Sequence, residues 1–156
     1  MSSKLPQFGP SVLVLAILMR KESVGLRVKC LRCGRCCLDT RMELSEADVE
    51  RLEGLGLRRE EFSVEGPDSI LRLRNVDGHC CFLVKAEARC RVYQHRPRGC
   101  AIYPVNITDD GEIVVDEACR TGGTVTRAEM ARKGSELRSL IATIDAEAAA
   151  RGERDA

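Results

Sequence analysis

The stretch CLRCGRCC, residues 30–37, places four of the chain's nine cysteines within eight residues. Cys30, Cys33 and Cys36 follow one another at C-x-x-C spacing, which is typical of thiolates that converge on one metal ion. Gly34 between them allows the left-handed or crowded backbone that such a turn needs. The sequence therefore predicts a fold organised around cysteine-ligated metal.

The second half of this stretch limits the kinds of metal site. Neighbouring side chains tend to diverge, so we expect Cys36 and Cys37 not to bind one small ion together. Cys37 is then predicted to face a second site, or a second metal of one cluster. The C-x-x-C-x-x-C spacing is similar to the start of an iron–sulfur run, but Asp39 and Thr40 stand where the Cys-Pro of that run would follow.

Composition favours one domain in a reducing compartment. The 156 residues include no Trp and only 3% aromatics, so the core is expected to be aliphatic and to gain from metal binding. A net charge of +1 argues against a chain built mainly to grip nucleic acid or an acidic membrane. An odd number of cysteines without a signal-peptide pattern predicts a cytoplasmic protein with free thiols.

The apolar segment SVLVLAILM, residues 11–19, is too short to span a bilayer, so no membrane attachment is predicted. It is a buried strand or short helix, or else translation begins at Met19. Residues 1–24 are interpreted as an N-terminal extension or as the product of a mis-assigned start. Residues 25–125 are interpreted as the metal-binding domain, and 126–156 as a helix and tail packed on it.

Local patterns predict a small α+β domain with short strands and short helices. Ser45 and Asp48 form the start signal of a helix that ends at Gly54 or Gly56, and a shorter turn covers residues 58–62. Strands are expected at residues 70–74, 81–84 and 111–117, the first two joined by an Asp-Gly turn. Thr126 and Glu129 form a capping box for a final amphipathic helix. Its apolar stripe is predicted to pack on its own domain, or else to form a homodimer: Met130, Leu137, Leu140, Ile141, Ile144 and Ala148.

Basic residues surround the cysteines in sequence. They include Arg27, Lys29, Arg32, Arg35 and Arg41 near the first group, and Arg89, Arg91, Arg96 and Arg98 near Cys90 and Cys100. Nearby cations favour thiolate over thiol and partly neutralise a multi-thiolate metal centre. The alternative is an ordinary solvated surface.

Together these motifs resemble the YkgJ-like cysteine-cluster proteins, described as zinc- or iron-chelating domains and often labelled iron–sulfur proteins. The resemblance covers roughly residues 28–120. It rests on C-x-x-C-G-x-C-C at residues 30–37, a glycine-led C-x-x-L at 78–83, CRVYQHRPRGCAIYP at 90–104, and a late cysteine. It implies eight metal ligands: Cys30, Cys33, Cys36, Cys37, Cys80, Cys90, Cys100 and Cys119.

The chain departs from this family pattern at two positions. Ala101 replaces a common arginine, and Cys81 is an additional cysteine that we interpret as a buried free thiol. His79 and His95 are predicted not to be ligands, because the thiols already complete the sites. Tyr93 and Tyr103 are expected to pack around the metal, and Arg96 with Pro97 to fix a turn.

Three functions follow from this pattern. The first is an iron–sulfur protein with an electron-transfer or other redox role and a redox partner protein. The second is a non-enzymatic zinc module whose closed sites present a surface to a protein or RNA partner. The third is a chelator that carries exchangeable metal. No nucleotide-binding or hydrolase motif is present, and aromatic residues are too few for a platform that stacks single-stranded nucleic acid.

Overall fold

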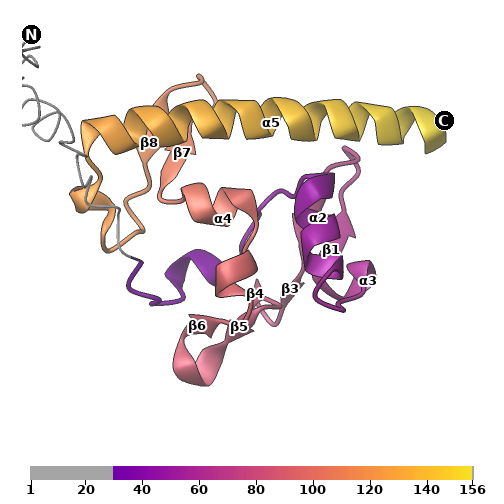
Figure 1. Cartoon of the computed structure of the whole chain (residues 1–156), viewed down its shortest axis with the longest axis horizontal. Coiled ribbons are helices and arrows are strands. Elements are labelled where there is room, and N and C mark those ends of the chain that lie inside the picture. The colour runs from indigo at the N-terminus through magenta and orange to yellow at the C-terminus, as the bar shows by residue number, and fades with distance from the viewer. Residues whose placement is uncertain (1–29, 156) are drawn as a thin grey trace, which may run out of the picture.

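The computed structural model describes residues 30–155, so the predicted extension 1–24, the apolar segment 11–19 and the basic residues Arg27 and Lys29 lie outside the described residues. Figure 1 shows short helices and hairpins arranged below one long C-terminal helix. The predicted fold class, a small α+β domain with a C-terminal helix, is confirmed.

The elements are short except for the last. The α-helices are α2 (Glu46–Glu53), α3 (Arg59–Phe62), α4 (Arg98–Ile102) and α5 (Arg127–Asp155). The 3-10 helices are η1 (Arg35–Cys37), η2 (Lys85–Glu87), η3 (Tyr93–His95) and η4 (Gly122–Thr124). The strands are β1 (Ser63–Glu65), β2 (Leu71–Leu73), β3 (Asn75–Val76), β4 (His79–Cys80), β5 (Leu83–Val84), β6 (Arg89–Cys90), β7 (Val105–Ile107) and β8 (Ile113–Val115).

The strands form four separate antiparallel pairs, β1–β2, β3–β4, β5–β6 and β7–β8. Each pair joins strands that are consecutive in the chain, and no two pairs share a strand. Isolated hairpins this short are at best marginally stable in water. Their stability therefore depends on packing against the helices and the apolar core.

Helix α2 begins as the sequence predicts. The Ser45 hydroxyl accepts a hydrogen bond from the Asp48 N–H at 3.2 Å, and the Asp48 carboxylate accepts one from the Ser45 N–H at 3.3 Å. The helix ends at Glu53, with Gly54 as its C-cap residue. The shorter turn predicted at residues 58–62 corresponds to helix α3.

The predicted hairpin between residues 70–74 and 81–84 is wrong in its pairing. The Asp77–Gly78 turn exists, but it joins β3 to β4, and Asn75 lies opposite Cys80. Strand β2 pairs instead with β1, and β5 pairs with β6. Strand β8 lies within the predicted strand 111–117.

The main apolar core lies between α2, α3 and the first hairpins. Phe62 and Phe82 stack there with their ring centroids 5.9 Å apart. The buried cluster consists of Leu44, Val49, Leu52, Phe62, Leu71, Leu73, Cys80, Phe82 and Val92. Four further cysteines pack against it while partly exposed: Cys37, Cys81, Cys90 and Cys100. The core therefore borders directly on the cysteines.

Helix α5 packs on its own chain, against β7, β8 and α4. Farther along, the Glu147 carboxylate accepts a hydrogen bond from the Glu46 N–H at 2.8 Å. Arg151 donates to the Ser69 carbonyl at 2.9 Å and pairs with Glu46 at 2.6 Å. The predicted helix is thus confirmed, while the homodimer stays a prediction. No helix within residues 30–155 is long and apolar enough to cross a membrane.

Candidate metal centre

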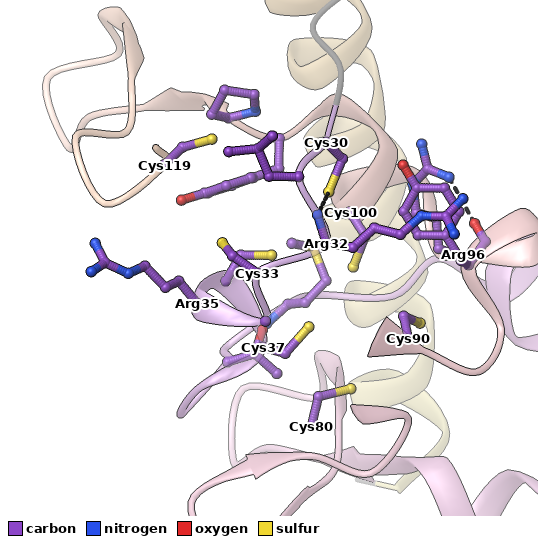
Figure 2. A pocket seen from close by; sticks show the side chains of 18 of the residues that line it. Cys30, Arg32, Cys33, Arg35, Cys37, Cys80, Cys90, Arg96, Cys100 and Cys119 are labelled. Carbon is purple, nitrogen blue, oxygen red and sulfur yellow. Dashed lines mark hydrogen bonds between the residues drawn. The ribbon is translucent and has the colours of Figure 1, made fainter. Parts of the chain in front are cut away.

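One pocket of about 130 Å³ collects the cysteines from across the described chain. Its lining includes eight thiols, from Cys30, Cys33, Cys36, Cys37, Cys80, Cys90, Cys100 and Cys119. In Figure 2 the labelled cysteines surround a common space. Cys81 does not line the pocket. It is half-buried rather than fully buried, and its thiol lies 4.0 Å from the Phe62 carbonyl.

Local turns position the first four of these cysteines. Gly34 has φ of +74° and is the N-cap residue of η1, which carries Cys36 and Cys37. The Cys37 N–H donates to the Gly34 carbonyl at 3.0 Å. The Arg32 N–H donates to the Cys30 thiol at 3.3 Å. Backbone amides thus both shape this loop and contact one of its sulfurs.

The hairpins supply Cys80 and Cys90. Cys80 lies at the end of β4 and is buried, and Cys90 lies opposite Leu83 in the β5–β6 ladder. Leu83 also limits the space around Gly34, where a Cβ atom would lie 3.2 Å from the Leu83 Cδ1. The β5–β6 hairpin therefore packs closely against the first cysteine loop, residues 30–37.

Helix α4 carries Cys100, and the buried Asp48 carboxylate fixes where this helix begins. Its Oδ1 accepts a hydrogen bond from the Arg98 N–H at 2.9 Å, while Oδ2 accepts from Ser45 at the start of α2. One carboxylate thus caps two helices, which is favourable because both N-termini carry partial positive charge. Arg51 adds a hydrogen bond to the Arg96 carbonyl at 3.1 Å.

The comparisons with known proteins agree with this geometry. Residues 29–120 match the model of the CxxCxxCC family, whose description reads "Putative zinc- or iron-chelating domain". The chain belongs to this family. No curated protein and no solved structure matched the chain. The eight thiols that line the pocket all fall within the matched residues of the CxxCxxCC domain, whereas α5 lies beyond them.

Cys36 and Cys37 differ from expectation, since their side chains do not diverge. The two thiols hydrogen-bond to each other, which lowers the pKa of Cys36 to about 7 and raises the pKa of Cys37. Cys36 is therefore the more acidic thiol of the pair. Both residues line the same pocket, and whether Cys37 binds a second site or a second metal of one cluster stays a prediction.

The deeper thiols favour their neutral form in the metal-free protein. Burial raises the pKa of Cys100 and of Cys90. A hydrogen bond with Cys81, with burial in addition, raises the pKa of Cys80. A metal ion binds the thiolate, so loading this CxxCxxCC domain must release protons from these groups.

Among residues 30–155, basic side chains line the pocket and no carboxylate does. The five basic side chains are Arg32, Arg35, Arg96, Arg120 and Lys133. Arg41, Arg89, Arg91 and Arg98, which the sequence also places near the cysteines, do not line the pocket. Arg32 and Arg96 both lie over the Tyr93 ring, 4.7 and 4.1 Å from its centroid. This charge distribution suits a centre that thiolates make negative.

Tyr93, Tyr103 and Pro97 line the pocket as expected of packing residues, and burial raises the pKa of Tyr103. Neither His79 nor His95 lines it. As they stand, no three cysteine, histidine or carboxylate side chains within residues 30–155 form a group that could hold a metal ion. The eight thiols of the lining are suitable donors for a thiolate-bound metal. Their sulfur atoms would have to approach one another to bind it.

Sequence reasoning missed two of the basic residues that line the pocket, Arg120 and Lys133. Arg120 follows Cys119 directly and could have been included with the other flanking arginines. Lys133 interrupts the apolar stripe of α5, three residues after Met130 and four before Leu137. A charged residue at a stripe position was the signal that could have identified it.

Proposed function

We propose that this CxxCxxCC domain binds a polynuclear metal centre through its eight pocket cysteines, and that the centre is an iron–sulfur cluster with an electron-transfer or other redox role. The observation that carries the proposal is the single shared pocket. Two closed four-thiolate sites would each need their own enclosed group of four sulfurs. Eight thiols around one space instead favour metals that share a centre.

The exposure of the pocket agrees with a redox role. Cys30 and Cys36 are exposed, whereas Cys80 is buried. A centre bound between them would lie near the surface, where a redox partner protein can approach. Solvent exposure and nearby charge also tune the potential of iron–sulfur clusters, and the cationic lining would stabilise the reduced, more negative state. The bound cluster would supply the one-electron chemistry.

A structural zinc module is the second candidate, favoured by the four separate strand pairs. Because no continuous sheet joins these hairpins, metal ligation would replace the missing core between the first cysteine loop, β4, β6 and α4. The free energy of binding at a structural zinc site adds directly to folding. In this role the domain would present its surface to a protein or RNA partner.

The test is expression of the full chain without oxygen, purification without a metal-affinity tag, and measurement of iron, zinc and acid-labile sulfide per chain with the visible spectrum. Iron with matching sulfide and visible absorption is expected for the cluster. Zinc without sulfide would overturn the cluster and support the structural module. A metal-free chain that also fails to take up either metal would refute both.

Cys80 and Cys81 provide a matched pair for the same measurement. They are adjacent and hydrogen-bonded to each other, but only Cys80 lines the pocket. We expect Cys80→Ser to lose bound metal and Cys81→Ser to retain it. Equal metal content in the two variants would contradict the assignment of the pocket cysteines.

A further inference from the structure

Lys133 is the one residue of α5 that lines the cysteine pocket within residues 30–155. It lies beyond residues 29–120, which match the family model, so nothing in the family match assigns it a role. The residue is only 8% exposed. A lysine is rarely this buried unless it is paired, so its position calls for a specific partner or task.

The helix is built to bring this side chain inward. Lys133 stands on the apolar stripe of α5, the face that packs against the domain. Its neighbour Gly134 lets the helix approach closely, since a Cβ atom there would lie 3.0 Å from the Ile113 side chain. A residue at position 133 is therefore held against the pocket rather than in solvent.

Two contacts fix the ammonium group. Its Nζ lies 3.3 Å from the Glu129 carboxylate, one helical turn earlier, and 3.4 Å from the Tyr103 carbonyl. Tyr103 itself lines the pocket, whereas Glu129 does not. The ion pair therefore places its positive member on the pocket side, and it ties α5 to the segment that follows Cys100.

Lys133 differs from the other four cations of the pocket in burial. Arg32, Arg35 and Arg120 are exposed, and Arg96 is half-buried. Water and salt screen exposed charges strongly and buried charges much less. Water and salt thus screen the lysine least among the five cations, while Glu129 offsets part of its charge.

We propose that Lys133 is a positioning residue of the metal centre, whose buried ammonium is the fixed counter-charge that lets eight thiolates gather around metal. This inference rests on the proposed metal-binding function, and it holds for either zinc or iron. It also gives α5 a task in the domain beyond packing, since the helix delivers the charge from outside the cysteine-bearing segments.

The experiment titrates zinc ion into the reduced, metal-free full chain in competition with a chromophoric chelator. We expect Lys133→Met to weaken zinc binding by about 10–100-fold, the range found when groups that support metal ligands are removed. Lys133→Arg should restore most of the affinity, because it keeps the charge. Arg132→Met, the control, removes an exposed cation from the next position and should leave zinc affinity unchanged.

A second variant separates charge from folding. Lys133→Met leaves Glu129 without this ion-pair partner, which by itself destabilises the fold, so Lys133→Met/Glu129→Gln removes both charges. We expect this double variant to bind zinc about 10–100-fold more weakly as well, with the defect persisting at high salt. Wild-type affinity in the double variant, or failure of Lys133→Arg to rescue, would overturn the role of Lys133. Absence of zinc binding by the wild type would instead overturn the structural zinc module and this inference for zinc, whereas the iron–sulfur proposal is decided by the measurement of iron and sulfide described above.

Discussion

Replacing Asp48 with alanine should destabilise the protein more than any change at the surface of α2. The side chain is fully buried, and its carboxylate accepts hydrogen bonds from the backbone N–H groups of both Ser45 and Arg98. A buried donor left without a partner costs about 1–3 kcal/mol. The Arg51 ion pair adds less, because the Arg51 side chain is 35% exposed and retains its bond to the Arg96 carbonyl. We therefore expect a loss of about 3 kcal/mol in the free energy of unfolding.

The assay is equilibrium unfolding of the reduced, metal-free chain in urea, followed by circular dichroism. Glu50→Ala is the matched control, since Glu50 lies on the exposed side of the same helix and should change stability by less than about 0.5 kcal/mol. A loss below about 1 kcal/mol for Asp48→Ala would refute the claim that one carboxylate caps two helices.

Three further predictions test the packing of α4, the backbone of the first cysteine loop and the packing of α5. Gly99→Ala would press a Cβ atom against the Met42 sulfur, so we expect the free energy of unfolding in urea to fall by about 1–3 kcal/mol, and Met42→Ala should partly restore it; no rescue would contradict the contact. Gly34→Ala and Gly56→Ala both force alanine into positive φ, so each should lower the free energy of unfolding by about 1–2 kcal/mol. Only Gly34→Ala should also weaken zinc binding, and equal zinc affinities of the two variants would contradict the role of Gly34 in the cysteine loop. Ile144→Ala should cost about 2–5 kcal/mol, because this side chain of α5 is 2% exposed; a loss below about 1 kcal/mol would show that the helix does not depend on this face.

Features encoded over a few residues were predictable from the sequence. The capping box of α2 and the start of α5 depend on side chains three positions apart, as in the bond from the Glu129 N–H to the Thr126 hydroxyl at 3.1 Å. The strands were harder, because two- and three-residue strands are too short to show a period of two. This is why the strands predicted at residues 70–74 and 81–84 were paired with each other, whereas β2 pairs with β1 and β5 with β6.

The candidate site was predictable in its membership more than in its geometry. The spacing of Cys30, Cys33 and Cys36 indicates a metal loop by local chemistry alone. Convergence with Cys80 and Cys119 depends on tertiary packing, which local spacing does not encode. The pairing of the Cys36 and Cys37 thiols was missed because the η1 turn bends the backbone away from the extended geometry in which neighbours diverge. Lys133 was missed because a lysine within a helix is usually solvated.

The spread of the pocket cysteines along the chain has a consequence during synthesis. About 80 residues separate Cys37 from Cys119, and translation at roughly 5–20 residues per second takes roughly 4–16 s to cover them. During the later part of that interval the first four thiols lie outside the ribosome while at least one of their partners has not been made. The nascent chain thus presents an incomplete chelating loop to oxidants and competing ions before its fold can shield it.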